Sequence, residues 1–315
     1  MINFNQLRDF YQVAKHLNYT IAARKLYITQ PAVTAQVKYF EEQCNLKFFK
    51  KKGRKIYLTD EGKALYDYAH SIFEYEKKIE NAIEEMRQLK RGILRLGTSK
   101  TYARYFMAFL ITHFHTSYPY IKIYLDEGSS LDMANSLVDF RNELAIIAKI
   151  EENPDICFIP FSQEEMLVIL PIDHQLAGKK GLSIKDLARE PIIMREKGSG
   201  TRKLVSELFT KKDLTPNILM ETGNTEFIKQ LVQRGDGISF LVKAAVTTEL
   251  KEKKLATVPL DGQKIFLDVS IAYLKDQHLS PPAQAFLDIL RNLGARAKPL
   301  HGIGTFMTEM TTHPK

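Results

Sequence analysis

The 315-residue sequence predicts a mixed α/β protein in three parts: a small helical unit, a long helix and a larger domain of alternating strands and helices. Three observations predict this class. Apolar residues recur at helical spacing over residues 7–40, no proline interrupts residues 60–90, and short β-type runs alternate with helical runs from residue 92 onward. The length allows two or more domains, each with its own core.

The first two helices follow from apolar spacing. The first is expected to pack through one stripe, Leu7, Phe10, Tyr11, Ala14 and Leu17. The second is expected from Thr20, as its N-cap, to about Leu26, with Ala22 and Ala23 as packing positions.

The third helix carries an apolar stripe and a face suited to a groove. Val33, Val37 and Phe40 recur at i, i+4 and i+7 and are expected in the core. The opposite face carries small, hydroxyl and cationic residues: Pro31, Thr34, Ala35 and Lys38. Thr29 is the expected N-cap, and Gln30 and Pro31 fit a first turn whose free N–H groups would face phosphates.

A basic hairpin is expected next. Residues 50–55 read Lys-Lys-Lys-Gly-Arg-Lys between two apolar runs, which predicts two strands and a cationic tip that includes Lys52 and Arg54. A lysine run alone is typical of a solvated loop. Because it follows two helices joined by a sharp turn, the whole pattern predicts a winged helix-turn-helix, whose partner is double-stranded DNA.

The charge distribution supports a nucleic-acid partner. Residues 1–60 hold 11 Lys and Arg against 4 Asp and Glu, a balance of +7 within a whole-chain charge of +8. Such a localised excess is an electrostatic footprint for nucleic acid. A membrane surface is the rival partner of any basic segment, but no strongly amphipathic basic helix accompanies this one.

Residues 60–90 predict a linker helix that pairs with a second chain. Its seam alternates steps of four and three residues: Leu65, Ala69, Ile72, Glu76, Ile79, Ile83 and Met86. A long amphipathic helix lying on its own domain is the alternative. Charged residues flank the narrow seam on both sides, which favours a homodimer that presents two recognition helices to a two-fold related DNA site.

The larger domain predicts parallel-rich sheets with helices on both faces. Strands are expected at 93–97, 121–125, 144–148, 156–161, 166–170, 192–195, 218–220, 238–241 and 267–274, and helices at 102–114, 132–140, 201–211, 225–233 and 282–293. Ligands of such sheets bind beyond the carboxyl ends of the strands.

Three strand-to-helix junctions carry small polar groups that favour an anion. They contain Ser99 and Thr101, then Ser199 and Thr201, and finally Asn224. Hydroxyls and open N–H groups at helix N-termini attract negative charge. Any one junction is explained as well by simple helix capping; three that converge on one cleft predict a small anionic ligand. Arg202 is a candidate for an anion contact or for a structural ion pair.

The order and spacing of several motifs resemble the LysR-type transcriptional regulators. The matching positions are Thr20, Ala22-Ala23, Leu26, Thr29 to Thr34, Val37-Lys38, Glu41, Phe48-Phe49 and Leu58 to Gly62. The family usually has Leu-Gly where this chain has Cys44-Asn45, serine at positions 29 and 34, and arginine at position 51. These differences retain hydroxyl and charge, so they bear on base preference more than on the fold. The run at 198–202 resembles family members that regulate sulfur assimilation or carbon fixation.

The resemblance implies domain bounds and a mechanism. It implies a winged helix-turn-helix at 1–59, a linker helix at 60–90 and a two-lobed domain like a type 2 periplasmic binding protein at 92–296. The end of the chain lacks periodicity, which predicts a flexible tail at 297–315. Lobe I would comprise 92–162 and 267–296, and lobe II 163–266. Effector contacts are implied at Ser99, Thr101, Thr201 and the 128–130 loop, which contains Gly128 and Ser129. A dimer or tetramer would bind promoter DNA under control of a small anionic co-inducer, with RNA polymerase as a partner of an activator.

Other classes of protein lack support in the sequence. Gly198-Ser199-Gly200 is not a dinucleotide fingerprint, since Lys203 stands where the third glycine belongs. No metal-spaced ligands, resident cofactor motif or nucleophile elbow point to an enzyme. Cys44 and Cys157 lie in different predicted domains, so we expect no disulfide, and Cys44 is expected as a buried thiol rather than a redox switch. The first ten residues lack a signal-peptide core and no run reaches membrane-spanning length, which predicts a cytoplasmic protein.

Two rival functions remain. One is an enzyme that its basic N-terminus only localises. The other is an architectural DNA-binding protein whose C-terminal domain binds no ligand; a thermal shift on adding a metabolite would count against it.

Overall fold

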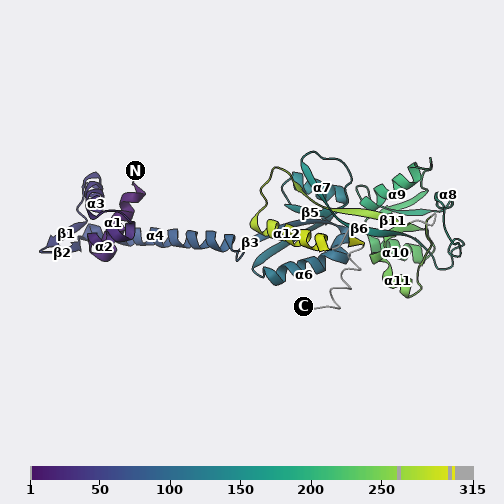
Figure 1. Ribbon diagram of the computed structural model, residues 1–315, viewed down its shortest axis with the longest axis horizontal. Helices are drawn as coiled ribbons and strands as arrows, with labels where there is room; N and C mark the ends of the chain where they lie inside the picture. The colour runs from purple at the N-terminus through teal and green to yellow at the C-terminus, as the bar shows by residue number, and fades with distance from the viewer. Residues whose placement is uncertain (1, 261–263, 297–299, 302–315) are drawn as a thin grey trace. The chain divides into compact units, whose positions relative to one another are not determined.

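The computed structural model describes residues 2–260, 264–296 and 300–301. It divides into two units, Met1–Glu85 and Met86–Lys315, each with its own hydrophobic cores. Figure 1 shows both units and labels many of their elements.

The smaller unit has three helices and a hairpin, as the apolar spacing predicts. They are α1 (Phe4–His16), α2 (Tyr19–Leu26), α3 (Gln30–Cys44), β1 (Phe49–Lys52) and β2 (Lys55–Leu58). The two strands pair antiparallel around a two-residue loop whose first residue, Gly53, has φ +60°. A positive φ at that place suits the twist of a tight hairpin, and glycine adopts it without steric cost.

The predicted apolar stripes form the core of this unit with one exception, and one predicted helix cap is wrong. Val33, Val37 and Phe40 are buried, and so are four of the five stripe residues of α1. Leu17 is wrong as a core residue, because α1 ends there in a left-handed turn that leaves its side chain 44% exposed. Thr20 is wrong as an N-cap, because the Asn18 side chain accepts from the N–H groups of residues 20 and 21.

The end of α3 also differs from expectation. Cys44 is exposed, so the prediction of a buried thiol there is wrong; it and Cys157 are free. Asn45 closes the helix with φ +51°. Asparagine tolerates this left-handed conformation better than most residues, which explains how it stands where the family has glycine.

Helix α4 (Asp60–Arg87) divides into two parts. In the first, Leu65 and Ala69 pack into the core of the smaller unit. The side chain of Glu76 pairs with Arg8 of α1. Beyond that point the apolar seam turns to solvent, and Ile79 and Ile83 are 60% and 53% exposed. The first part of the predicted seam is therefore a packing surface within the smaller unit, and the part beyond Glu76 is an exposed apolar stripe.

The larger unit is built on one eight-stranded sheet. Its first part contains β3 (Gly92–Ser99), β4 (Ile121–Gly128) and β5 (Leu144–Ile147), in which β3 pairs parallel with both others. Two long antiparallel strands, β6 (Ile156–Leu170) and β11 (Ile265–Leu274), then extend out of this part of the sheet.

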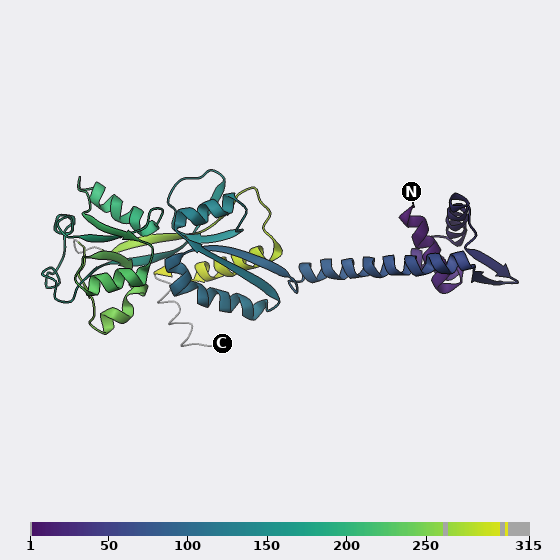
Figure 2. The same cartoon turned by 180° about the vertical axis from the view of Figure 1, so that it is seen from behind.

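Helices cover both faces of the first part, which we call lobe I. One face carries α6 (Ala108–Ser117) and α12 (Pro281–Arg296), which lie side by side in Figures 1 and 2. The other face carries α7 (Ser130–Val138). The helix predicted at 102–114 begins earlier, with α5 (Lys100–Tyr102) and a π-helical turn, η1 (Ala103–Met107). The final helix packs on β3, as the family resemblance implies.

The second part, lobe II, has its own core drawn from residues 166–260. Its predicted elements are present as β7 (Ile192–Arg195), α9 (Gly200–Thr210), β8 (Ile218–Thr222), α10 (Thr225–Gln233) and β9 (Ser239–Val242). Short elements that the sequence pattern missed are α8 (Ile184–Leu187), η2 (Lys243–Ala245), α11 (Thr247–Lys251) and β10 (Ala256–Thr257). Strands β7 and β8 pair parallel, and β9 and β10 pair with β6.

The strands that join the lobes correct one prediction. Residues 156–161 and 166–170 form one continuous strand, because the polar residues between them pair with β11 instead of forming a turn. Gln163 there donates to Asp268 at 2.8 Å. The predicted tail at 297–315 lies outside the described residues except for β12 (Leu300–His301), which pairs parallel with β6.

Candidate functional site

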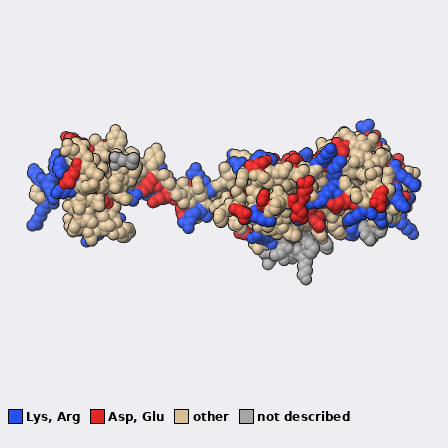
Figure 3. Space-filling model, turned by 90° about the horizontal axis from the view of Figure 1, so that it is seen from above, with Lys and Arg blue, Asp and Glu red and all other residues tan. Residues whose placement is uncertain are grey.

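The predicted DNA contacts all lie at the surface of α3 and the hairpin. Helix α3 presents Thr29, Gln30, Pro31, Ala35 and Lys38 as exposed residues, with Thr34 half-buried among them. Over the hairpin, Lys and Arg side chains gather in Figure 3, and residues 50–52 together with Arg54 and Lys55 are all exposed. The core side of α3 is apolar, so its polar face and the hairpin are left open to a partner.

Local bonds prepare the start of α3. The Thr29 side chain accepts from the Ala32 N–H at 3.4 Å, which makes it the N-cap that the sequence predicts. The Thr34 hydroxyl donates to the Gln30 carbonyl at 2.9 Å, so its proton is used within the helix and its oxygen can still accept a hydrogen bond. Lys38 pairs loosely with Glu42, at 3.8 Å on a 70% exposed side chain, which leaves its charge available to a phosphate.

Glu41 is a positioning residue that the residue pattern alone did not single out. It is buried at the end of α3, and its Oε1 accepts from the N–H groups of Phe48 and Phe49 at 2.8 and 3.2 Å. Lys47 pairs with its other oxygen at 3.1 Å. The carboxylate thus ties the start of the hairpin to the third helix. The signals in the sequence were an acidic residue beside the apolar stripe and the match of Glu41 to the family pattern.

Tyr27 is a second surface residue that sequence reasoning missed. It ends α2 with φ +58°, and its N–H donates to carbonyls of the last turn of that helix. Its side chain is 95% exposed in the turn that leads to α3. A phenol hydroxyl so placed suits a backbone contact with nucleic acid.

Six of the seven predicted effector contacts line one cleft between the lobes. From lobe I come Ser99, Thr101, Gly128 and Ser129, and from lobe II come Ser199 and Thr201. Asn224 does not line it; it is exposed and caps α10 by accepting from the Phe227 N–H. The space inside for the centres of water-sized molecules is about 20 Å³, which is room for a single water.

Capping explains part of this polar set. Ser99 caps α5, and Ser129 caps α7 within a capping box in which Asp132 bonds back to the Ser129 N–H. Ser199 stands at the N-cap of α9 but, within the described residues, makes no side-chain bond to that helix. Thr201 lies inside α9 and is 5% exposed, so it is not a cap. The first turn of α9 therefore keeps open N–H donors beside the cleft.

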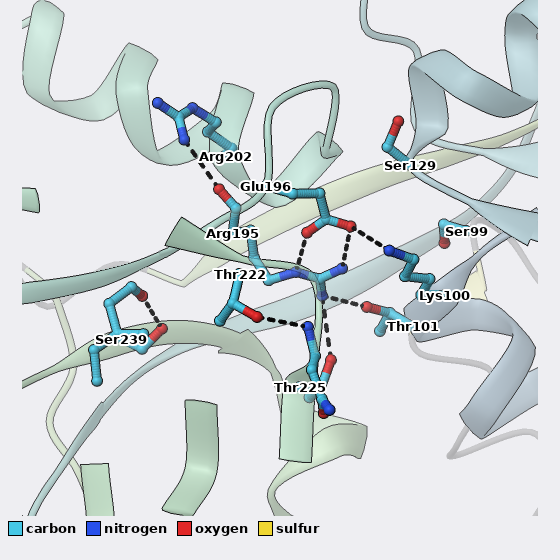
Figure 4. A network of polar contacts seen from close by, with 12 residues as sticks. Ser99, Lys100, Thr101, Ser129, Arg195, Glu196, Arg202, Thr222, Thr225 and Ser239 are labelled. Carbon is cyan, nitrogen blue, oxygen red and sulfur yellow. Dashed lines mark hydrogen bonds and ion pairs between the residues drawn. The ribbon is translucent and has the colours of Figure 1, made fainter. Parts of the chain in front are cut away.

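Arg195 is the buried cation of the cleft, and sequence reasoning assigned it only to a strand end. It is 4% exposed. Figure 4 shows its guanidinium between the lobes. Its Nη1 donates to Thr101 of lobe I at 2.8 Å and to Thr225 of lobe II at 3.3 Å. The Glu196 carboxylate accepts hydrogen bonds from Nε and Nη2 of Arg195, at 2.8 and 3.2 Å.

Lys100 adds a second cation to this network. Its Nζ lies 3.8 Å from Oε1 of Glu196, so the pair crosses from lobe I to lobe II. Burial acts to raise the pKa of Glu196, but the hydrogen bonds and charge of Arg195 outweigh it and hold that pKa below its ordinary value. The carboxylate is therefore ionised at neutral pH.

A separate buried carboxylate lies at the base of the cleft. Oε1 of Glu164 accepts from the hydroxyls of Tyr102 and Ser162 at 3.2 and 2.9 Å, and these hydroxyls lie 2.6 Å apart. Burial, and then the charge of Glu164, raise the pKa of Tyr102 well above its ordinary range. This network joins α5 to β6 where the strand passes between the lobes.

Arg202 does not line the cleft but holds the backbone of Arg195, which does. Its Nη2 lies 2.8 Å from Glu221, and its Nη1 donates to the Arg195 carbonyl at 3.1 Å. The sequence leaves two roles open for Arg202, an anion contact and a structural ion pair, and the structure shows the ion pair. Arg202 thereby fixes the backbone that carries Arg195.

No group of three or more His, Cys, Asp or Glu side chains within 2–260, 264–296 and 300–301 is placed to hold a metal ion. Nor does any helix in this part of the chain have the length and apolar character needed to cross a membrane.

Comparison with known families matches both units. Residues 4–63 match the family described as bacterial regulatory helix-turn-helix protein, lysR family. Residues 87–295 match the family described as LysR substrate binding domain. Together the two matches span nearly all the described residues.

Relatives and solved structures agree with these matches. The chain is 35% identical to the HTH-type transcriptional activator CmpR of Synechocystis sp., over 91% of this chain and 94% of that protein. It is 30% identical to a RuBisCO operon transcriptional regulator of Allochromatium vinosum, over 94% and 97%. A full-length OxyR variant of Pseudomonas aeruginosa shares the fold, with TM-score 0.74, 21% identity and coverage of 93% and 99%. The effector binding domain of QuiR in complex with shikimate has TM-score 0.60, 25% identity and coverage of 65% and 98%.

Proposed function

The chain belongs to the LysR family of transcriptional regulators, and on that premise we propose that a small anion bound between its lobes controls its binding to promoter DNA as a homodimer or tetramer. Like these relatives, it is a transcriptional regulator and not an enzyme. We take residues 1–59 as the DNA-binding domain, 60–90 as the linker and 92–296 as the effector domain.

The DNA-binding proposal rests on one observation above all: the polar face of α3 and the cationic hairpin are both uncovered on one small unit. Helix α3 has the dimensions to enter a major groove, and its small residues allow close approach. The hairpin lysines and Arg54 suit phosphates or the minor groove beside it. The eight predicted contact residues stay the proposed contacts.

The dimer proposal rests on the exposed apolar residues of α4. Ile72, Ile79, Ile83 and Met86 are 38%, 60%, 53% and 47% exposed along one seam. A row of large apolar side chains on a single helix favours burial against a second copy of that helix.

The effector proposal rests on the composition of the cleft. Hydroxyls from both lobes, the open first turn of α9 and two cations suit an oxyanion. The QuiR effector domain, which has the same fold, binds shikimate. An anion with unequal affinity for two arrangements of the lobes would shift the protein between them and so alter the dimer on DNA. The description of CmpR as an activator supports RNA polymerase as a further partner.

Binding to DNA tests the first proposal. Purified full-length protein is titrated onto the intergenic fragment upstream of its own gene and onto a scrambled fragment, across a salt series. Tight and salt-sensitive binding to the native fragment alone is expected. Equal binding at every salt concentration, there and at divergent neighbouring promoters, would contradict sequence-specific regulation.

Charge removal locates the interface. Lys38→Gln and Arg54→Gln are each expected to weaken binding and to lower the slope of log affinity against log salt by about one, because each contact releases counterions. Lys211→Gln, at an exposed position in lobe II, is the control and should leave both quantities unchanged. Unchanged affinity in Lys38→Gln and Arg54→Gln would remove those residues from the interface.

A cleft variant tests the effector site. Thr201→Leu places a larger apolar side chain in the cleft and is expected to abolish the thermal shift caused by an anionic metabolite that stabilises the wild type. Binding to DNA should be retained. A full metabolite response in Thr201→Leu would place the effector elsewhere.

A further inference from the structure

The cation site of the cleft is already filled by the protein's own carboxylate. Arg195 and Lys100 come from different lobes, and Glu196 lies between them (Figure 4). The two bonds from the guanidinium, at 2.8 and 3.2 Å, are those of a bidentate Arg–carboxylate pair, the geometry in which arginine also binds carboxylate and phosphoryl ligands. Glu196 thus stands where the oxyanion of a ligand would be held.

The cleft has little free space in this arrangement of the lobes, and Glu196 is one of the residues that line it. Only about 20 Å³ is left for the centres of water-sized molecules. The lobes also touch directly, since the Leu131 N–H donates to the Gly198 carbonyl at 3.1 Å. A metabolite can therefore enter only if a side chain leaves or the lobes separate.

Of the bidentate pair, Glu196 is freer to leave than Arg195. Arg195 is the last residue of β7; its carbonyl is held by Arg202, and its guanidinium is held from both lobes by Thr101 and Thr225. Glu196 lies in the connection between β7 and α9, and its side chain is 20% exposed against 4% for Arg195. Rotation of the glutamate toward solvent would leave two cations and the open turn of α9 without an anion.

We propose that Glu196 is an internal competitor of the effector, and that an effector binds by placing a carboxylate or phosphoryl oxyanion on Arg195 and Lys100 in exchange for the Glu196 carboxylate. This inference rests on the proposed effector role of the cleft. It identifies the ligand class as metabolites that carry a compact oxyanion. The apparent affinity is lowered by the fraction of time that Glu196 occupies the site, which sets the metabolite concentration at which the regulator responds.

The experiment measures oxyanion binding to full-length protein, with sodium sulfate and sodium phosphate as probes, by calorimetric titration at constant ionic strength. Glu196→Gln and Glu196→Ala are expected to bind the probes roughly tenfold tighter than wild type, because the competing charge is gone. Glu190→Gln is the matched control. It removes one negative charge from lobe II at a side chain of similar exposure, 14%, which pairs with His174 outside the cleft.

The outcomes separate this inference from the proposed function. Equal or weaker probe binding in both Glu196 variants, when each unfolds cooperatively and binds DNA as wild type does, overturns the competitor role. An equal gain in Glu190→Gln overturns it as well, since the effect would then be general electrostatics. Adding Arg195→Gln to Glu196→Ala should abolish the gain; a retained gain places the anion elsewhere. Failure of wild-type protein to select promoter DNA would instead count against the proposed function.

Discussion

At the scale of single residues, buried or capping carboxylates fix the local geometry of both units. Glu41 accepts two backbone N–H groups and a lysine, and so sets where the hairpin starts relative to α3. Asp132 completes the capping box of α7 at the edge of the cleft. Each of these side chains satisfies backbone donors that have no helical or strand partner, which is why its loss affects a segment rather than one contact.

Replacing Glu41 should loosen the hairpin. Glu41→Ala leaves the Phe48 and Phe49 amides without their buried acceptor, and we expect a local loss of about 2 kcal/mol, or roughly thirtyfold faster amide exchange over residues 48–58. Hydrogen exchange with mass spectrometry measures it. Glu42→Ala, at the 56% exposed neighbour, should change exchange little. Equal exchange in the two variants would contradict the positioning role.

The Asp132 cap predicts a pH dependence. Side-chain and backbone hydrogen bonds from Ser129 hold the pKa of Asp132 below its ordinary value of 3.8. A lowered folded pKa means that the cap contributes fully above about pH 4 and is lost as pH falls through the lower folded value. Asp132→Asn should therefore be less stable than wild type at pH 7, and the difference should shrink on acidification. Urea unfolding from pH 7 to 2 tests this, and a constant difference would contradict it.

At the scale of elements, α4 is a helix with two surfaces in succession. Its first part belongs to the core of the smaller unit, and its second part carries an apolar stripe that nothing in the described chain covers. The heptad spacing alone predicts an apolar seam. It does not predict at which residue the seam stops packing into the core of the smaller unit and becomes exposed. That change depends on where α1 begins, because Arg8 lies near the N-terminus of α1, and its ion pair with Glu76 is the contact farthest along α4 that the ion pairs record between the two helices.

A charge in the uncovered stripe should separate the dimer. Ile79→Asp buries a carboxylate in the proposed helix pair, and we expect the dimer to dissociate at least thirtyfold more readily, a loss of about 2 kcal/mol. Sedimentation over a concentration series measures it. Asn81→Asp introduces the same charge at an exposed position off the stripe and should leave the dimer intact. If Ile79→Asp dimerised as wild type does, the stripe would not be the interface.

At the scale of the whole effector domain, the lobes meet so closely that a methyl group matters. A Cβ on Gly200 would lie 2.3 Å from the Cβ of Ala148 in the other lobe. Together with the bond between Leu131 and Gly198 and the contacts of Arg195, this approach holds the cleft shut. The state of the cleft is thus decided by contacts between residues far apart in the chain.

Gly200→Ala should hold the lobes apart. The added methyl cannot fit at that distance, so we expect a destabilisation of about 1–3 kcal/mol and faster exchange of the Leu131 amide. Gly178→Ala is the control, because a Cβ at Gly178 meets no atom within 4 Å. Thermal unfolding and amide exchange report the two effects. Unchanged Leu131 exchange in Gly200→Ala would show that the lobes accommodate the methyl without opening.

The sequence by itself determined the local elements and the class of protein. Apolar spacing defines α1 to α4 because a helix buries one stripe, and the lysine run around Gly53 defines the hairpin. Polar residues at strand ends led to four of the cleft residues, since the carboxyl ends of strands gather at one edge of a sheet, and the family resemblance implied the other two, Gly128 and Ser129. Only the tertiary structure decided the pairing of Arg195 with Glu196 and the burial of Glu41. It also decided that the two strands predicted at 156–161 and 166–170 form the single strand β6. Each of these depends on partners brought together by folding or on a charge whose burial no local pattern records.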